Sequence, residues 1–535
     1  MAKTPNIPDI PEHERTPLVA QLLEVIHYQM EMIQSLRDEI AVVKGDKPKP
    51  KIKPSGMEKG DKKDSDKKPS DGKRPGSEKR KKTEELKIHK MVPIAPKDIP
   101  EGSIFKGHKK FIAQGIIIRP HNILYLLERW ETPDGSYVEG KLPPYVKGHF
   151  DPSLISYIQY QFYQCQVTQP LLLEQLWEFE IDISSGQISR ILIEGHDNFH
   201  GEKDEILSTG LQISSYINVD DTGARHKGNN GFCTHIGNDL FAWFESTESK
   251  SRINFLELLG AGKSEYMLNA DAIDYMKSQK LPITPLQLLI QSDKKIFISK
   301  DEWGNYLETL GIINRLHVRI ATEGALIGGI LENGFNPDLA IMSDDAGQFN
   351  ILLHVLCWVH AERTIHKIVP FTDDQRTAVE SIKEKIWNLY YDLKRYKENP
   401  KSESKRELEK RFDELFQEKT CFVTLNLALK RLYKNKPDLL LVLERPDVPL
   451  HNNASESDIR EYAKRRKVSG GTKSDDGRKS RDTFISLKKT CRKLGVSFWD
   501  YLNDRNFKRY SIPRISELMR KMALAPPYPK IPINK

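Results

Sequence analysis

The spacing of apolar residues near the N-terminus is a heptad. Eight seam positions lie between residues 19 and 43, and seven of them are apolar, with Gln29 as the exception. This pattern predicts a coiled coil over residues 17–44, in which a polar seam residue fixes the register or the oligomeric state. A single helix that packs on a later part of the chain would have the same pattern and is the alternative.

Large apolar side chains are almost absent from residues 45–90, which are rich in Lys, Pro, Ser, Gly and Asp. Such a segment cannot bury enough apolar surface to offset its chain entropy, so we expect a disordered basic linker. Two β-rich runs follow at 111–120 and 122–131, and the turn sequence Pro133-Asp134-Gly135-Ser136 comes after them. These runs predict a small β-rich module over residues 91–150.

Helical periodicity begins after this module. Thr168-Gln169-Pro170 is typical of a helix start, and Ser184 or Ser185 can cap a second helix after a short break. Two helices joined by a tight turn predict a helix-turn-helix-like region over 151–200, although any helical hairpin has this appearance. The second helix presents three side chains of types that contact base edges or phosphates: Gln187, Ser189 and Arg190.

The longest part of the chain alternates strands and helices. Three short strand patterns with turn residues between them start at residue 211, and a helix-and-loop stretch of about 80 residues follows. Residues 337–345 then read as a strand that ends in two acids, and 349–368 as a helix. This order predicts an α/β ribonuclease-H-like core over 211–510, with a helical insertion at about 370–445 and a C-terminal tail at 511–535.

Three carboxylates stand at the ends of predicted elements. Asp220 ends the first strand, Asp344 ends a later strand, and Glu456 lies one turn into a helix after a loop. Such ends can converge on one point although they are distant in sequence. Carboxylate oxygens suit Mg²⁺, and two such ions can stabilise both the attacking and the leaving oxygen of a phosphoryl displacement. Three carboxylates gathered in this way would bind two Mg²⁺ ions, which is one interpretation of the pattern.

Each of these acids also has a purely structural interpretation. Asp220 and Asp221 precede Thr222-Gly223 and can belong to a turn. Glu456 follows Asn453 by three residues, as in a variant capping box, and Arg460 stands four residues after Glu456, as in a helix ion pair. Spacing alone leaves these alternatives open.

Charge is distributed unevenly along the 535 residues. The net charge is +8, and residues 46–90 carry 17 Lys/Arg against nine Asp/Glu, which gives +8. Residues 459–493 carry 13 basic residues against four acids, which gives +9, so the rest of the chain sums to −9. Basic stretches on an acidic body indicate a polyanionic partner, although a solvated linker has the same composition.

Composition excludes several classes of protein. No apolar run reaches the roughly 18 residues that a membrane span needs, and the N-terminal sequence lacks the basic and apolar regions of a secretory signal. The five cysteines include no C-x-x-C pair. We therefore expect a cytoplasmic protein without a disulfide framework or a zinc module.

Several sequence blocks resemble the insertion sequence 66 family of bacterial Asp-Asp-Glu transposases. The resemblance covers roughly residues 150–510. Its most specific blocks are HNNASESDIREYAKRRKVSGGTKSDDG and SLKKTCRKLGVS, and INVDDTGARHKG, MSDDAGQF and LCWVHAERTIHK accompany them. The resemblance implies a DNA transposase with a ribonuclease-H-like core, in which Asp220, Asp344 and Glu456 are the catalytic residues and bind Mg²⁺ or Mn²⁺.

The sequence departs from the family pattern at three places. Asp221 stands where the family usually has Glu, and Asp345 stands where it has Gly, so either Asp344 or Asp345 can be the metal ligand. Many relatives carry a cysteine-rich zinc module before the helix-turn-helix region, whereas residues 46–150 contain no cysteine. We expect no zinc there, and the β-rich module takes its place.

Further residues are candidates for contacts with DNA. Cys357 and His360 form a C-x-x-H pair, which favours buried packing over half a zinc site. The recurrence of this block in the family implies that His360 and Arg363 contact DNA. Basic residues at helical spacing after Glu456 and in the following turn are candidate phosphate contacts: Arg460, Lys464, Lys467 and Lys473.

The sequence leaves two other functions open. One is a non-catalytic DNA-binding or scaffold protein derived from a transposase, and the other is a ribonuclease-H-like nuclease. The presence of all three acids disfavours decay of the active site, and the helical insertion favours transposition over simple cleavage. We expect element ends and target DNA as partners, a homodimer or higher oligomer through residues 17–44, and possible accessory proteins of the element.

Overall fold

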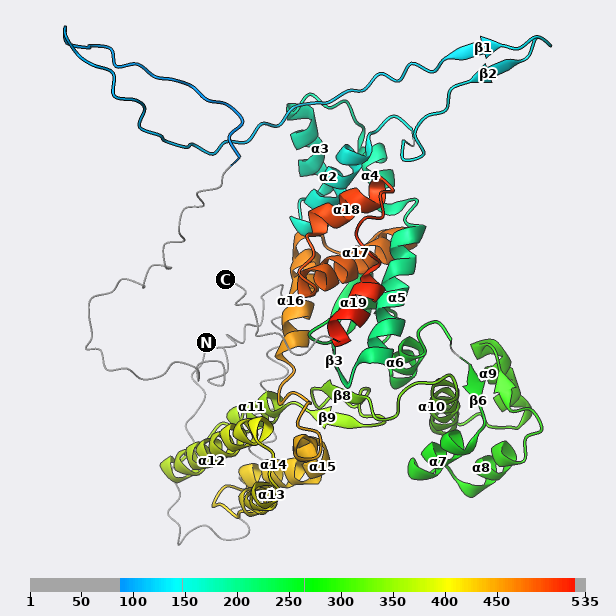
Figure 1. Cartoon of the computed structure of the whole chain (residues 1–535). Helices are drawn as coiled ribbons and strands as arrows, with labels where there is room; N and C mark the ends of the chain where they lie inside the picture. The colour runs from blue at the N-terminus through cyan, green and yellow to red at the C-terminus, as the bar shows by residue number, and fades with distance from the viewer. Residues whose placement is uncertain (1–86, 147, 264, 525–535) are drawn as a thin grey trace, which may run out of the picture. The chain divides into compact units, whose positions relative to one another are not determined.

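The computed structural model describes residues 87–146, 148–263 and 265–524. The predicted coiled coil at 17–44, nearly all of the linker at 45–90 and residues 525–535 lie outside these ranges. The chain divides into two compact units, whose described parts are 87–121 and 122–524. Residues 87–121 contain no helix or strand, whereas 122–524 contain the sheet and the helices shown in Figure 1.

The region predicted as a β-rich module contains one short hairpin. β1 (Arg129–Glu131) pairs antiparallel with β2 (Tyr137–Glu139). The run 111–120 forms no strand, and the run 122–131 contributes only its last three residues, which corrects the prediction. A strand needs a partner for its backbone N–H and C=O groups, and β-forming side chains alone do not supply one.

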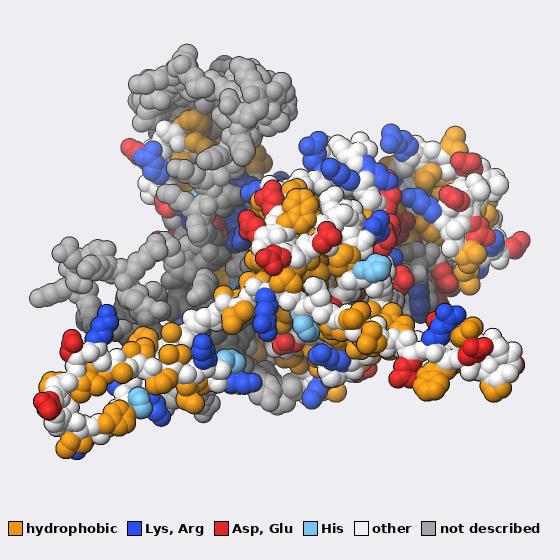
Figure 2. Space-filling view, turned by 90° about the horizontal axis from the view of Figure 1, so that it is seen from above, with side chains coloured by type: hydrophobic (Ala, Val, Ile, Leu, Met, Phe, Trp, Pro, Cys, Tyr) orange, Lys and Arg blue, Asp and Glu red, His pale blue; other side chains and the backbone are white. Residues whose placement is uncertain are grey.

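Apolar side chains of this stretch are exposed to solvent, and hydrophobic side chains are visible on the surface in Figure 2. The exposed fraction is 86% for Met91, 88% for Phe111 and 83% for Leu124. These residues therefore belong to no hydrophobic core, which agrees with the absence of regular structure around them.

Five helical segments lead from the hairpin to the central sheet: α2 (Pro152–Gln159), η3 (Tyr160–Gln164), α3 (Gln169–Glu178), α4 (Ser185–Ile193) and α5 (Asp197–Ile213). The predicted helix pair is present as α3 and α4. The Gln187 N–H donates to Ser184 Oγ (3.2 Å), so Ser184 is the N-cap. Leu172 and Leu176 of α3 and Ile188 of α4 are fully buried, which explains the apolar spacing of both helices.

The central sheet has five strands. β3 (Tyr216–His226), β4 (Asn229–Gly237) and β5 (Ala242–Thr247) form the predicted antiparallel meander. β8 (Ala340–Ser343) pairs parallel with β3, and β9 (His354–Leu356) pairs parallel with β8. The strand order is therefore β5-β4-β3-β8-β9, with β3 at the centre.

One predicted helix is partly a strand. The stretch 349–368 contains β9 and then α11 (Trp358–His366), so only its second half is helical. All three residues of β9 are buried. A buried parallel strand is a short continuous apolar run, and such a run cannot be distinguished from a buried helix by its periodicity.

Helix α17 (Asp475–Lys493) covers the β5 edge of the sheet. Three of its side chains, four residues apart, accept hydrogen bonds from alternate backbone N–H groups of β5. A four-residue helical step is about 6 Å, close to a two-residue step in a strand, so the two rows match. The pairs are Ala242–Thr490 (3.1 Å), Phe244–Ser486 (2.9 Å) and Ser246–Asp482 (2.8 Å). The edge is therefore closed to pairing with another strand.

A helical segment of residues 252–332 lies between β5 and β8. Its helices are α6 (Arg252–Leu259), α7 (Ala270–Ser278), α8 (Ile283–Ile290), α9 (Lys300–Thr309) and α10 (Arg315–Glu332). A small pair of strands accompanies them: β6 (Tyr266–Met267) and β7 (Ile296–Phe297). α10 passes so close to β6 that a Cβ at Gly329 would stand 2.0 Å from the Glu265 carbonyl oxygen. Glycine is required there by space.

The predicted insertion at 370–445 is helical. It contains α12 (Asp373–Glu398), α13 (Ser402–Phe416), α14 (Val423–Lys434), α15 (Lys436–Leu440) and the short turn η4 (Leu441–Leu443). These helices lie together in Figure 1 and bury an aromatic and aliphatic interior that includes Leu389 and Phe412.

The C-terminal region holds α16 (Asn453–Ser469), α17, α18 (Phe498–Asn506) and α19 (Ile515–Leu524). The expected tail at 511–535 is therefore helical over 515–524, and α19 packs on α5 through the fully buried Ile515 and Met519. No helix in the described part of the chain is long and apolar enough to cross a membrane.

The closed β5 edge gives a test of the fold. Ser486→Ala would leave the buried Phe244 N–H without an acceptor, and we expect the free energy of unfolding to fall by about 1–3 kcal/mol in urea titrations. Ser404→Ala removes an exposed hydroxyl on α13 and should change that free energy by less than about 0.5 kcal/mol. Equal values for the two variants would contradict the role of Ser486.

Candidate active site

The three predicted acids lie on elements that meet at the centre of the sheet. Asp220 is in β3, Asp344 directly follows β8, and Glu456 is in the first turn of α16. β3 and β8 are parallel neighbours, and Asn218 lies opposite Met342. Asp220 and Asp344 each follow this pair by two residues, so both acids lie at the same end of the paired segment. The structure therefore brings together side chains that are 124 and 112 residues apart in sequence.

The pKa of Asp220 reports this proximity. Burial raises it, and the negative charge of Asp344 raises it further, with smaller contributions from Asp221 and Glu456. The backbone N–H of Asp221 opposes the shift by donating to Asp220 Oδ1 (2.8 Å). The resulting pKa is about 7, so the carboxyl of Asp220 is close to half protonated at neutral pH.

Asn452 fixes the start of α16 against β3. Its Nδ2 donates to the Val219 carbonyl oxygen (2.8 Å), and its Oδ1 accepts from Asn218 Nδ2 (2.8 Å). The Asn452 side chain is fully buried, and Asn218 and Val219 immediately precede Asp220. Asn452 thus sets the position of Glu456, one turn later, relative to Asp220.

The buried Cys357 and Trp358 support the same junction. The Asn452 N–H donates to Cys357 Sγ (3.2 Å), and the Trp358 N–H donates to the Leu450 carbonyl oxygen (3.0 Å). Burial raises the pKa of Cys357 to about 11, so its thiol is protonated. This agrees with the interpretation of Cys357 and Trp358 as packing residues.

The acids adjacent in sequence to Asp220 and Asp344 have other partners. Asp221 accepts from Thr234 Oγ1 (2.5 Å) and from Gln348 Nε2 (3.0 Å). Asp345 is exposed and pairs with Arg431 of α14. The geometry therefore favours Asp344 over Asp345 as the acid that faces Asp220, a choice that the sequence left open.

A hydrogen-bond chain that the sequence analysis missed supports Asp344. Ser343 Oγ donates to the Asp344 carbonyl oxygen (2.6 Å) and lies 2.8 Å from His354 Nε2. His354 Nδ1 lies 3.1 Å from Asp438 Oδ2 of α15. A hydrolase triad has the same Ser–His–Asp order, but Ser343 is fully buried and cannot meet a substrate. These hydrogen bonds instead hold the Asp344 backbone in place. The residues are too far apart in sequence to form a recognisable motif.

Glu456 contacts basic side chains on both of its oxygens. Arg363 Nη1 lies 3.2 Å from Oε1, and Arg460 Nη2 lies 3.2 Å from Oε2. His360 Nε2 stands 3.8 Å from Oε1, and burial lowers the pKa of His360, which is further lowered by Arg363. The predicted DNA contacts His360 and Arg363 therefore lie beside the third acid.

No group of three or more His, Cys, Asp or Glu side chains within the described ranges is arranged so that it could hold a metal ion. The contacts of Glu456 give a reason, because arginines occupy both of its oxygens. The donor chemistry of Asp220, Asp344 and Glu456 suits a hard divalent cation. A complete ligand set would require the Glu456 carboxylate to leave its arginine partners.

The other predicted DNA contacts fall into two groups. Lys464, Lys467 and Lys473 are exposed, and none of their side chains has a hydrogen bond or ion pair with another described residue. Gln187 and Arg190 on α4 bond to each other, with Arg190 Nη2 donating to Gln187 Oε1 (2.6 Å), and Ser189 of the same helix is partly buried. Lys464 and Lys467 continue from Arg460 along α16, Lys473 follows the end of that helix, and the other three residues lie on α4.

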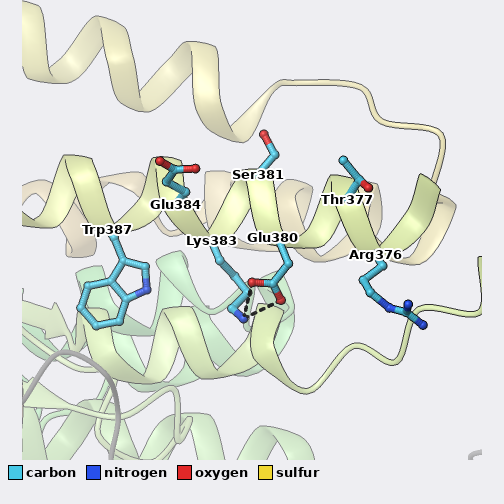
Figure 3. Close-up of a pocket in the computed structure, with 7 residues that line it drawn as sticks. All are labelled: Arg376, Thr377, Glu380, Ser381, Lys383, Glu384 and Trp387. Carbon is cyan, nitrogen blue, oxygen red and sulfur yellow. Dashed lines mark hydrogen bonds and ion pairs between the residues drawn. The ribbon is translucent and has the colours of Figure 1, made fainter. Parts of the chain in front are cut away.

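A surface hollow lies on the helical insertion (Figure 3). The residues that line it all belong to α12, and Lys383 Nζ bonds both carboxylate oxygens of Glu380 (2.9 and 3.2 Å). The lining residues are Arg376, Thr377, Glu380, Ser381, Lys383, Glu384 and Trp387. None of the three acids lines this hollow.

Comparison with known proteins places the site in a family context. The model of the Transposase IS66 family matches residues 326–480, which include Asp344 and Glu456. The Uncharacterized protein y4jO of Sinorhizobium fredii is 43% identical over 302 residues, which are 56% of this chain and 94% of that protein.

The raised pKa of Asp220 predicts a pH dependence of stability. Between about pH 4 and pH 7 the folded protein keeps a proton that the unfolded chain has lost, so the free energy of unfolding falls as the pH rises and stays low above pH 7. Asp220→Asn should abolish this fall and raise the free energy of unfolding at pH 8 by about 1–3 kcal/mol in metal-free urea titrations.

Asp345→Asn is the matched control, because Asp345 is exposed and pairs with Arg431. It should leave the free energy of unfolding at pH 8 nearly unchanged. An Asp220→Asn protein that is no more stable than the wild type at pH 8 would show that the crowding of carboxylates at Asp220 is absent.

Proposed function

The chain belongs to the Transposase IS66 family, and from this premise we propose that it is a DNA transposase. It cuts the ends of a bacterial insertion sequence and joins them to target DNA by metal-assisted phosphoryl transfer. The main support for this proposal is that Asp220, Asp344 and Glu456 lie close together at the centre of the sheet. The acids come from two strands and one helix, so the fold itself assembles them.

The sheet supports a ribonuclease-H-like interpretation of the core. Its three antiparallel strands, followed by two parallel strands beyond β3, are in the order that the proposal expects. α16 returns to β3 through Asn452 and supplies the third acid. The helical insertion lies between β9 and α16 in sequence, which is the place that the sequence pattern predicted.

The proposed cofactor is Mg²⁺ or Mn²⁺. Asp220, Asp344 and Glu456 are the residues that would hold it, and it would supply charge stabilisation for the attacking and leaving oxygens. The raised pKa of Asp220 supports the proposal, because a cation beside crowded carboxylates relieves their repulsion. The protein contributes the fixed backbone positions that Asn452, Ser343 and His354 maintain.

The chain's own basic residues would position the DNA. Arg460, Lys464 and Lys467 follow one another by four and three residues, so they share a face of α16 that starts beside Glu456. Lys473 extends this row past the end of the helix. Such contacts neutralise phosphates without reading sequence, whereas Gln187, Ser189 and Arg190 of α4 are the proposed contacts with element ends.

Assembly of two ends requires more than one subunit. We propose that residues 17–44 form the dimer contact and that the protein acts in the bacterial cytoplasm, with or without accessory proteins of the element. The competing proposals are a non-catalytic DNA-binding scaffold and a ribonuclease-H-like nuclease. Strand transfer of a labelled element end into plasmid DNA distinguishes all three, because a nuclease cuts without joining and a scaffold does neither.

Substitution of each acid tests the catalytic proposal. Asp220→Asn, Asp344→Asn and Glu456→Gln should each lower the rate of Mg²⁺-dependent cleavage of element-end DNA by more than about 100-fold, because each would remove a metal ligand. Binding of the same DNA, measured by fluorescence anisotropy in EDTA, should change by less than about threefold. Asp345→Asn should retain most of the activity, since Asp345 pairs with Arg431. If the Glu456→Gln protein cleaved DNA at the wild-type rate, Glu456 would not be a catalytic residue.

Salt dependence tests the basic face of α16. Lys464→Gln with Lys467→Gln should weaken DNA binding and reduce the slope of log affinity against log salt by about 2, because two phosphate contacts are lost. Lys410 on α13 is similarly exposed and serves as the control site for Gln substitution. An unchanged slope in the double variant would place the DNA elsewhere on the protein.

A further inference from the structure

Glu456 is held by two arginines that come from different helices. Arg363 of α11 contacts one carboxylate oxygen and Arg460 of α16 contacts the other, each at 3.2 Å. The Glu456 side chain is only 16% exposed, so little of it is left for solvent or a further ligand. In this arrangement the third acid of the proposed site is neutralised by protein cations.

His360 orients one of these arginines. Arg363 Nη1 lies 3.2 Å from His360 Nε2 as well as 3.2 Å from Glu456 Oε1, so one amino group bridges the two side chains. A guanidinium has only donors, so His360 Nε2 is the acceptor in this contact. His360 Nδ1 is buried and has no hydrogen-bond partner in the part of the chain that is described.

We propose that Arg363 and Arg460 are positioning residues that withhold Glu456 from a divalent cation until DNA binds. This inference rests on the proposed function. DNA phosphates would take the two guanidinium groups, and the freed Glu456 carboxylate would then complete the ligand set with Asp220 and Asp344. DNA and metal would consequently bind cooperatively, each raising the affinity for the other.

Exposure and chemistry identify DNA phosphate as the competitor. The Arg460 side chain is 65% exposed and the Arg363 side chain is 27% exposed, so both can be reached from solvent. A guanidinium binds phosphate with the same two-point geometry that it uses for a carboxylate. The Lys464 and Lys467 side chains continue from Arg460 along α16 without partners in the described structure, so a phosphate backbone beside Arg460 would meet further cations on the same helix face.

The strength of the two ion pairs fits such an exchange. The Arg460–Glu456 contact is a four-residue helix pair with an exposed cation, a class of interaction that is weak and easily replaced. The Arg363 contact is less exposed and is supported by His360, so it is the stronger restraint on Glu456. Arg460 is therefore the first arginine to release Glu456, and Arg363 is the second.

Manganese binding tests this proposal without measuring catalysis. The full-length protein would be titrated with Mn²⁺, and free Mn²⁺ would be followed by electron paramagnetic resonance, with and without a duplex that carries the element end. Mn²⁺ bound by the same concentration of duplex alone would be subtracted. For the wild type we expect the duplex to tighten Mn²⁺ binding by about tenfold, a typical size for coupling between two sites.

The arginine variants should lose this coupling. Arg363→Gln with Arg460→Gln should bind Mn²⁺ about three- to tenfold more tightly than the wild type without DNA, and the duplex should add no further tightening. Arg460→Gln alone, which changes an exposed side chain, should show the same direction with a smaller effect. This single variant keeps the test valid if the double variant does not fold, as judged by circular dichroism.

Arg376→Gln is the matched control. Arg376 pairs with Asp373 at the start of α12 (2.9 Å) and lines the hollow on that helix (Figure 3), so its loss removes a similar ion pair away from Glu456. It should leave Mn²⁺ affinity and the tenfold coupling as in the wild type. If it tightened Mn²⁺ binding as much as the arginine pair does, the effect would be one of net charge and the proposal would be wrong.

Two further outcomes separate this inference from the proposed function. In the first, the wild type binds Mn²⁺ equally well with and without DNA, and Asp220→Asn does not bind Mn²⁺. This result would overturn the role of the arginines but leave the proposed metal site intact. Mn²⁺ binding that is the same in wild type and Asp220→Asn would overturn the metal site and this inference together.

Discussion

The parallel pairing of β3 with β8 is the constraint on which the candidate site depends. It joins residue 216 to residue 340 and thereby places Asp220 and Asp344 on the same side of the sheet. Asn452 adds the third element, because its two hydrogen bonds to β3 hold the start of α16 against the same strand. Part of the intervening chain supports this arrangement, because His354 contacts both Ser343 and Asp438, and Cys357 accepts from the Asn452 N–H.

The negative charges at this junction are only partly compensated by positive side chains. Burial and the neighbouring acids raise the pKa of Asp220 to about 7, whereas Glu456 is compensated by arginines. A fold selected for stability alone would not place unpaired carboxylates side by side, since each costs free energy when charged. Sites that carry such a cost are typical of catalytic or ligand-binding positions.

The sequence predicted the elements with strong local signals. The meander of β3, β4 and β5, the strand before Asp344 and the helix that carries Glu456 all follow from apolar alternation and turn residues. The apolar run that contains β9 predicts a helix, because a buried apolar run has no distinguishing period. The run at 111–120 predicts a strand that the structure lacks, because β propensity does not reveal whether a partner strand exists.

The sequence also named the candidate acids, but not what surrounds them. The contacts of Arg363 with Glu456 and of Asp438 with His354 join residues 93 and 84 positions apart, and no local pattern records such pairs. The choice of Asp344 over Asp345 likewise required the position of Arg431. These contacts depend on tertiary packing, so they became visible only in the folded chain.

The most direct test of the central claim is an anomalous difference map at the manganese edge. It would be calculated from crystals of the full-length protein bound to element-end DNA and Mn²⁺. The account predicts manganese peaks in contact with the carboxylates of Asp220, Asp344 and Glu456. Peaks that contact Asp345 instead of Asp344, or that lie away from all three acids, would contradict it.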